Sequence, residues 1–557
     1  MGNRIAPAGG TRISFALLAF ALVASLVQVV SIAPAQALPT DQGPAIVPGA
    51  DTSGLQDSEG QWDSKNQHRI WFNTDGNRWD AVLPASVASG ATVPSAWMIA
   101  KGVIPGSLPA ATPVYGPQVT ADPQHRPDAY WDQATNTLYV LVSGSTTQFF
   151  RYSYNTGTDI YTQTASVTLT GMNAEEARAV IYKVGTDLFA SVMNGDGLFV
   201  TRSTDNGGSW ATPTNLILPV AEGQTQLTSF VDGATYLAVA AAEDGDADLD
   251  GGRLSRYLFY KLDLANVANW NLNVKAFGTL TVATQPGPGT TITIGDRVYN
   301  FQNAPLPVAP GNVLIGVDVA ATRNNLAAAV GGTGTPGVEY SLETIPHGTV
   351  TMTAFNGSGV ATVTAKEAGA GGNAIATLPV GGNGFATGTL LNGNSGWTSE
   401  TVPLQAGANV SGITLHSDDE LSLVTYQNTV YMATETQRTG GTAAAELDAQ
   451  VVLFRRAPGN PATGNWIQSN VKMDQPSSEF DRKRPVVAIM DDQIYVIAIN
   501  NPRTSSAYFR VPLASIPNLG GGWGTTNELF NTEFERYRNN IVPRERVIAS
   551  QRLPILI

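Results

Sequence analysis

The chain has 557 residues, no cysteine, 45 acidic and 32 basic side chains, and a formal net charge of −13. This length exceeds one ordinary domain, and an apolar content of 43% can form hydrophobic cores, so a wholly disordered chain is excluded. The absence of cysteine excludes disulfide scaffolds, thiol catalysis and Cys-ligated zinc, and the acidic balance argues against nucleic-acid binding.

The first 37 residues have the pattern of a secretory signal peptide. Arg4 and Arg12 form a positive n-region, residues 14–32 are almost entirely apolar, and residues 35–37 (AQA) offer small side chains at the cleavage positions. An uncleaved anchor is the alternative, because the apolar run is nearly long enough to span a bilayer. Cleavage is favoured because a polar segment rich in proline and glycine follows at once.

Cleavage leaves 30 basic and 45 acidic residues, a net charge of −15, and no second apolar run of membrane length. We therefore expect a secreted protein, extracellular or at the cell surface, with no membrane insertion once the signal is removed. Residues 38–65 are expected to form a flexible N-terminal segment.

A repeated hairpin pattern runs through the rest of the chain. Each copy has an apolar strand, a short turn with Asp, Asn or Gly, and an apolar strand carrying an aromatic residue. The copies are residues 70–83, 129–143, 179–193, 229–242, 422–436 and 486–500. A second hairpin is expected at residues 149–161, 198–210, 257–270, 452–466 and 508–523. Six four-stranded units of this kind predict a mainly β chain, a six-bladed β-propeller.

The spacing of the repeats points to an insertion. The aromatic markers of the first hairpins are Trp79, Tyr139, Phe189, Tyr236, Tyr431 and Tyr495. Consecutive markers lie 47 to 64 residues apart, except that Tyr236 and Tyr431 are separated by 195. The long step contains residues 277–393, a block with 21 of the 57 glycines, eight charged residues and no tryptophan. We expect a small α+β, mostly β, domain inserted in blade four.

The expected domain boundaries follow from this insertion. Residues 66–276 would form blades one to four, and residues 394–528 the end of blade four with blades five and six. Residues 270–275 and 397–403 would be the split outer edge of blade four. Residues 529–557 would close the ring, with a strand supplied by residues 546–557.

Inside the inserted block, residues 278–282, 291–301, 348–355 and 359–365 have strand patterns. Residues 317–330 predict a helix, from their alanine content, the four-residue spacing of Leu326 and Val330, and the Gly331-Gly332 stop signal. With TLTV, TITIGDRVYNF, the helix and ATVTAKEAGAGGNAIAT in this order, the block resembles a module of phage tail and other virion-surface proteins. The resemblance covers about a fifth of the chain and implies an adhesion or display role without catalytic residues.

The sharpest local motif is STDNGGSW at residues 203–210, which fits S-x-D-x-G-x-[ST]-W. Ser203 and Asp205 can accept backbone N–H groups, Gly207 can take a positive φ, and Trp210 can pack between hairpins. The motif resembles the Asp box (BNR repeat) of sialidases and related propellers. In that family the box lies on the rim, away from the catalytic centre, so it implies the fold and not the reaction.

Four of the six first strands begin with arginine at similar distances from the aromatic marker, and Glu420 takes this place in blade five. The first strands of a propeller line its central channel, and planar guanidinium groups match carboxylates. The motif at residues 203–210 resembles the Asp box of sialidases, and sialidases bind the sugar carboxylate with an arginine triad. The candidate ligand-binding residues are Arg69, Arg126, Asp128, Arg178, Glu420 and Arg484. The alternative is that these arginines form ion pairs that hold blades together.

The chain departs from catalytic sialidases in two respects. The family's Arg-Ile-Pro is absent, and Arg69-Ile70-Trp71 is the nearest string. No nucleophilic Tyr with a Glu partner can be assigned among Tyr426, Tyr495 and Tyr537, although a retaining mechanism needs a nucleophile and an acid. The catalytic residues are therefore unassigned.

Residues 244–252 (DGDADLDGG) contain D-x-D-x-D-G, which resembles calcium loops of EF-hands and integrin-type propellers. Oxygen ligands at alternate positions suit Ca²⁺. The candidate metal ligands are Asp244, Asp246, Asp248 and Asp250. Tyr257 and Leu254 stand where those families have further carboxylates, so a solvated acidic loop without metal is the alternative.

The leading hypothesis is a secreted sialidase-like propeller that binds extracellular glycans or cell-surface polysaccharide, expected to be anionic, with an inserted adhesion or display domain. One alternative is an exo-acting glycoside hydrolase of the sialidase type, acting on sialic-acid-like sugars. A second alternative is a non-catalytic structural surface protein.

Overall fold

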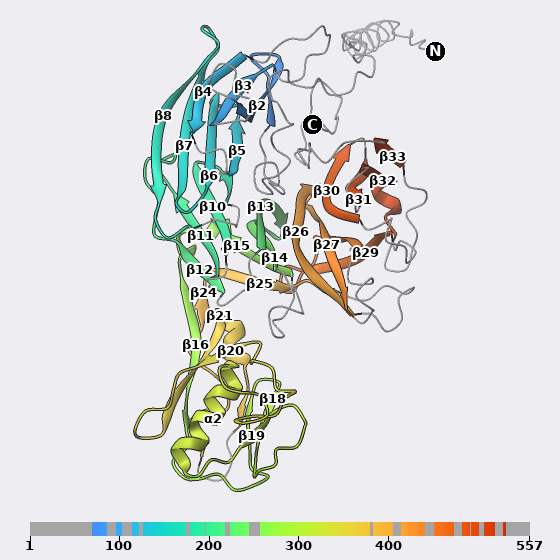
Figure 1. The fold of residues 1–557 in the computed structure, drawn as a ribbon. Coiled ribbons are helices and arrows are strands. Elements are labelled where there is room, and N and C mark those ends of the chain that lie inside the picture. The colour runs from blue at the N-terminus through green and yellow to red at the C-terminus, as the bar shows by residue number, and fades with distance from the viewer. Residues whose placement is uncertain are drawn as a thin grey trace, which may run out of the picture.

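The structure is a computed structural model. It describes residues 70–85, 96–102, 114–121, 126–173, 179–194, 197–217, 223–243, 257–378, 383–404, 414–439, 450–472, 482–490, 492–500, 506–517 and 527–530. The described chain is mainly β and forms several antiparallel sheets (Figure 1).

Six groups of four strands follow one another along the chain, and within each group neighbouring strands pair antiparallel. Sheet one is β1 (Ile70–Asn73), β2 (Arg78–Ala85), β3 (Ala96–Lys101) and β4 (Val114–Thr120). Sheet two is β5 (Arg126–Asp132), β6 (Thr137–Ser143), β7 (Thr147–Asn155) and β8 (Ile160–Leu169). Sheet three is β9 (Val180–Val184), β10 (Asp187–Asn194), β11 (Gly197–Ser203) and β12 (Thr214–Ile217).

Sheet four takes three consecutive strands and a fourth from further along the chain: β13 (Gly223–Asp232), β14 (Ala234–Glu243), β15 (Tyr257–Asp263) and β25 (Trp397–Thr401). Sheet five is β26 (Thr414–Tyr426), β27 (Thr429–Thr439), β28 (Gln450–Ala457) and β29 (Asn465–Lys472). Sheet six is β30 (Arg482–Met490), β31 (Gln493–Asn500), β32 (Ser506–Pro512) and β33 (Asn527–Phe530).

The first hairpin of every sheet turns through residues with positive φ. These residues are Asn77, Asn136, Gly185, Gly233, Gln427 with Asn428, and Asp492. Left-handed backbone matches the twist of a tight β-hairpin, and Gly, Asn and Asp adopt it at low cost. The turn chemistry seen in the sequence therefore fixes where each hairpin reverses.

The hydrophobic cores lie between successive sheets. Five apolar clusters join sheets one and two, two and three, three and four, four and five, and five and six. Successive side chains of a strand point to opposite faces, so one strand serves two clusters. On β6, Leu138 and Val140 pack toward sheet one, whereas Tyr139 and Leu141 pack toward sheet three. The six sheets thus stack face to face in chain order.

Between β15 and β25 the chain leaves sheet four. It passes a 3-10 helix, η2 (Leu264–Asn269), and forms a separate unit with its own core, away from the six sheets (Figure 1). Its elements are β16 (Asn273–Thr281), β17 (Thr291–Ile294), β18 (Arg297–Gln302), β19 (Asn312–Leu314), α2 (Val319–Gly331), β20 (Val350–Met352), β21 (Val360–Ala368), η3 (Ala370–Ala374), β22 (Thr377–Leu378), β23 (Gly384–Phe385) and β24 (Asn394–Ser395).

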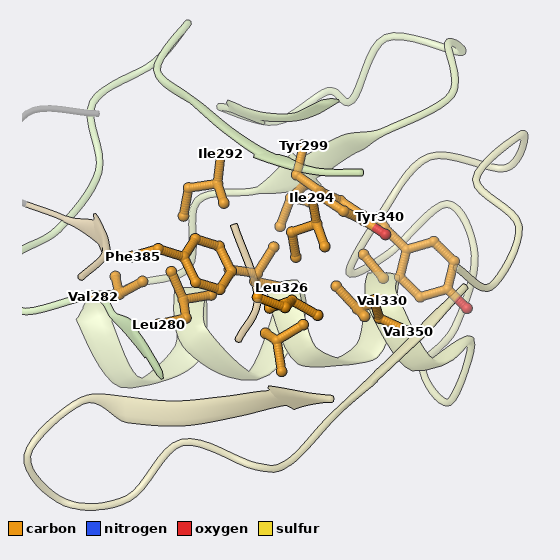
Figure 2. Packing of buried hydrophobic residues seen from close by; sticks show 14 of the residues in the cluster. Leu280, Val282, Ile292, Ile294, Tyr299, Leu326, Val330, Tyr340, Val350 and Phe385 are labelled. Atoms are coloured by element: carbon orange, nitrogen blue, oxygen red, sulfur yellow. The ribbon is translucent and has the colours of Figure 1, made fainter. Parts of the chain in front are cut away.

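The helix α2 covers one side of this core. Its N-cap Asp318 accepts a hydrogen bond from the N–H of Ala321, and Gly332 ends it with φ of 68°. Leu326 and Val330 point from the helix toward the strand residues of the core (Figure 2). The predicted helix is confirmed, and its capping residues are those that favour these positions.

Most predicted hairpins are confirmed, and the one at 257–270 is wrong. After β15 the chain enters η2, and the strand that pairs with β15 is β25, which begins at Trp397. Residues 397–403 therefore do begin the outer strand of sheet four. Residues 270–275 do not, because Asn273 starts β16, which pairs with β21, β23 and β24. Trp523, expected in the last hairpin, and the closing strand at 546–557 lie outside the described residues.

Candidate functional site

The six sheets have two distinct ends. We call one of them the turn end. At this end the first strand of each sheet joins the second, and the third strand joins the fourth. The opposite end, where the first strands begin, is the strand-start end. At the turn end Asn136 Nδ2 donates to Asp75 Oδ2 (2.7 Å), and Tyr426 OH donates to Asp492 Oδ1 (2.8 Å). These bonds join the turn ends of sheets one and two and of sheets five and six.

The Asp box forms the turn between β11 and β12, at the turn end. Ser203 Oγ donates to Asp205 Oδ1 (2.8 Å) and accepts from the N–H of Gly207 (2.8 Å). Asp205 also accepts from the N–H and the hydroxyl of Ser209, at 2.8 and 2.7 Å. The Trp210 ring meets the edge of Phe149 from sheet two, with centroids 5.2 Å apart. The residues named by the motif thus build one turn and seat it on the neighbouring sheet.

Gly207 is required in this turn. Its φ is +83°, and a Cβ there would lie 2.2 Å from the Phe149 ring. Arg151 of sheet two donates to the carbonyl of Asn206 (2.8 Å), and the Tyr139 hydroxyl donates to Asn206 Oδ1. The box therefore serves as a structural contact between sheets two and three.

The hydrogen bonds to Asp205 predict an acid-sensitive contribution to stability. The Ser209 hydroxyl, the Ser209 N–H and the Ser203 hydroxyl lower the pKa of Asp205 from 3.8 to about 2. A pKa lowered on folding stabilises the fold above the unfolded value, and this contribution falls as the pH drops from 3.8 toward 2. We expect Asp205→Asn to lower the melting temperature at pH 6, with the difference from wild type shrinking below pH 4. Equal differences at pH 6 and pH 2 would contradict this account.

A cation on the third strand of one sheet repeatedly reaches a backbone carbonyl between the third and fourth strands of the next. Arg151 donates to Asn206 O as described, and Arg202 Nη1 donates to Val267 O (3.1 Å). Lys101 Nζ donates to Asp159 O (2.6 Å), and Lys261 Nζ donates to Pro461 O. We call these four contacts the cation latches. They tie sheets one to five together in sequence at the turn end.

The latch between sheets four and five is part of a buried ionic network. Arg456 of β28 is 0% exposed; its Nε donates to Glu400 Oε2 (2.7 Å) and one Nη to Glu400 Oε1 (2.8 Å). The same nitrogen reaches Asp232 Oδ2 at 2.9 Å, and Lys261 pairs with Glu400. Burial alone would lower the pKa of Arg456, but bonds to Glu400 and Asp232 outweigh it and raise that pKa. This network joins β13, β15 and β25 to β28.

Tyrosine–carboxylate pairs also lie at the turn end. Tyr161 OH donates to Asp80 Oδ2 (2.8 Å) and Tyr154 OH to Asp159 Oδ1 (2.9 Å), besides the Tyr426–Asp492 pair. Burial, then the charge of Asp80, raises the pKa of Tyr161, and burial with the Asp159 hydrogen bond raises that of Tyr154. Tyr161 is buried, and its hydroxyl also accepts hydrogen bonds from Trp71 Nε1 and Asn73 Nδ2, so this tyrosine joins sheet two to sheet one.

The strand-start end carries the candidate residues that the structure describes. Arg126 begins β5, and Arg484 is the third residue of β30. Asp128 is 0% exposed, and its Oδ2 accepts from the N–H of Ile181 in sheet three (2.8 Å). This contact gives Asp128 a role in joining sheets two and three. The side chains of Arg126, Glu420 and Arg484, and Arg69 and Arg178 entirely, lie outside the described residues.

Two candidate residues sit where the backbone of a first strand is bulged. On β26 the pairing shifts between Ser417 and Leu421, so Glu420 lies in the bulge. On β30 it shifts between Lys483 and Val486, so Arg484 lies in a bulge as well. β26 and β30 contact one another. Bulges re-aim side chains and are frequent beside active sites. They also mean that counting residues back from the aromatic marker does not give equal heights along the strands.

The candidate metal ligands Asp244, Asp246, Asp248 and Asp250 lie outside the described residues. Within the described ranges, no three His, Asp or Glu side chains are close enough to hold a metal ion. No helix in the described part of the chain is long and apolar enough to cross a membrane.

Comparison with known proteins gives no sequence match, neither to a family model nor to a curated protein. Similar solved structures include the polysaccharide lyase Uly1, with 8% identity, a TM-score of 0.36, and coverage of 88% of this chain and 87% of that chain. The phage phi92 endosialidase has 12% identity, a TM-score of 0.26 and coverage of 66% and 50%. The Fusarium graminearum α-L-arabinofuranosidase arb93a has 8% identity and a TM-score of 0.32, with coverage of 82% of this chain and 96% of that chain. At such low identities and scores, function is best argued from this chain's own residues.

Proposed function

We propose that this chain is a secreted six-bladed β-propeller that binds an anionic extracellular glycan at its strand-start end. In this proposal sheets one to six are the blades, and residues 277–393 are an inserted adhesion or display domain. The signal peptide at residues 1–37 and a Ca²⁺ loop at 244–250 belong to the same proposal.

The fold part of the proposal is supported by the stacking of the sheets. Each sheet has four strands in simple order, each packs on its successor through an apolar cluster, and consecutive first strands contact one another. This is the arrangement of propeller blades around an axis lined by first strands. The Asp box adds a turn typical of the sialidase-like class.

The single observation that carries the site is the pair of bulges at Glu420 and Arg484. Both interrupt first strands of adjacent sheets, the one on β30 near the start of the strand and the one on β26 in its middle, and both hold charged residues. Arginine recognises carboxylates and sulfates through paired N–H groups. The turn end, in contrast, uses its charges in the cation latches and the buried network. A ligand is therefore expected at the strand-start end.

Hydrolysis of sialic-acid-like sugars remains the second candidate function, and a purely structural surface role the third. The described tyrosine–carboxylate pairs at the turn end do not supply a nucleophile at the strand-start end. Glycan binding is therefore the leading proposal, and hydrolysis is the alternative that the experiment below tests.

The test is a glycan array combined with a panel of fluorogenic glycosides, using the mature chain. We expect binding to a subset of uronate-, sulfate- or sialate-bearing glycans and no release of fluorophore. Turnover of a sialoside would favour the hydrolase instead. Absence of both binding and turnover would contradict both ideas and favour the structural role.

A further inference from the structure

The inserted unit is joined to the six sheets at its root by more than its two connecting segments. Two tryptophans flank the root, Trp270 before it and Trp397 after it. Both are buried in the apolar cluster between sheets three and four, at 5% and 3% exposure. Trp397 Nε1 donates to the carbonyl of Trp270 (2.7 Å), and Gly396 N donates to Leu272 O (3.0 Å). The outgoing and returning segments are thus held together where they leave the core.

On one side the root is attached to sheet three. β21 of the inserted unit pairs with β12, the outer strand of sheet three, at Ile217 and Glu367. Asn273 Nδ2 donates to the carbonyl of Asn215, and the latch from Arg202 reaches Val267 in η2. Sheet three and the sheet of the inserted unit that contains β16 and β21 therefore form one nine-stranded sheet, joined at this residue pair.

On the other side the root is attached to sheet five. β25, which follows the inserted unit directly, carries Glu400 into the buried ionic network with Arg456 of β28. Trp466 Nε1 of β29 also donates to Glu400 Oε2 (3.0 Å). The returning strand is therefore fixed to the sheet that follows it, as the outgoing segment is fixed to the sheet that precedes it.

We propose that the inserted unit is a rigid arm held in one direction by this two-sided clamp, rather than a tethered domain that reorients freely. Domains joined by small polar interfaces are expected to move relative to one another. Here a shared sheet, two buried tryptophans and a buried ionic network replace such an interface. The arm then presents its surface in a fixed direction. Ten of the twelve exposed large hydrophobic side chains among the described residues belong to the inserted unit as a whole.

The chain has no cysteine, so two spin labels can be placed without removing native thiols. We choose Ser358→Cys in the inserted unit and Ala462→Cys between β28 and β29, both exposed positions. Pulsed electron-spin distance measurement on the mature chain should give one narrow distance distribution. A broad distribution in the otherwise unchanged protein would overturn the proposal.

The clamp is tested by the added pair Trp397→Phe/Glu400→Gln, which removes the indole bond to the Trp270 carbonyl and the negative charge that pairs with Arg456 and Lys261. We expect loss of the narrow peak, while Thr279→Ala, an exposed change on β16 outside the clamp, keeps it. An unchanged narrow peak in the double variant would overturn the assignment of rigidity to these contacts. The proposal extends the display role of the inserted domain, and a distance measurement requires no ligand, so its failure is distinguishable from failure of glycan binding.

Discussion

Arg456→Met is expected to lower the free energy of unfolding of the six sheets by about 3–5 kcal/mol, the usual cost of removing one partner from a buried ionic group. The substitution keeps much of the side-chain volume but leaves Glu400 and Asp232 with less compensating charge, both being almost fully buried. Urea unfolding followed by tryptophan fluorescence measures the effect, because residues 277–393 contain no tryptophan and the inserted block adds nothing to the signal.

The matched control is Arg151→Met, the same change on the third strand of sheet two. Arg151 is half-buried, and its bonds go to the carbonyl of Asn206 and the hydroxyl of Thr164. Losing such bonds costs about 1 kcal/mol. Equal losses for the two variants would contradict the view that the network between sheets four and five differs from the other cation latches.

Trp397→Ala is expected to cost about 3–5 kcal/mol, as large-to-small changes of buried aromatic residues do. The side chain fills the cluster between sheets three and four and donates its indole N–H to Trp270 O. The loss should appear in the transition of the six sheets and leave the core of the inserted unit intact, because that core contains no residue of this cluster.

Trp210→Ala is the comparison for Trp397→Ala. Trp210 is the last residue of the Asp box; it is only partly buried, and its ring packs on Phe149 of sheet two. We expect a clearly smaller loss than for Trp397. Unfolding of the inserted unit can be followed by amide hydrogen exchange of its strands. If Trp397→Ala unfolded the inserted unit first, the separateness of the two cores would be contradicted.

Much of the fold could be predicted from the sequence because its signals are local. The hairpins follow from alternating apolar residues and from turns such as Asn136 and Gly233, and α2 from its alanines and Gly332. The outer strand of sheet four is harder to predict from the sequence. Asn273–Thr281 has strand character, and the sequence alone does not tell that its partners lie in the inserted unit and not in β15.

The polar contacts between sheets could not be predicted, because their members are distant in sequence. Asp232 and Arg456 are separated by 224 positions, and Lys261 and Glu400 by 139. The third strands of sheets one to four each carry a basic residue that reaches the next sheet, but its acceptor is a backbone carbonyl, which carries no sequence signal. The bulge at Arg484 likewise leaves no trace in spacing alone, so the distance from Tyr495 does not give the height of Arg484 along its strand.

The central claim is that an anionic glycan binds at the strand-start end. The most direct measurement compares the affinity of a glycan selected from the array for Arg126→Ala/Arg484→Ala with that for Arg151→Ala/Arg202→Ala. Both pairs remove two arginines: the first pair from the strand-start end of sheets two and six, the second from the turn end of sheets two and three. We predict that the first pair abolishes binding in a folded protein, while the second retains wild-type affinity despite lower stability. Retained binding in the first pair, or loss only in the second, would contradict the account.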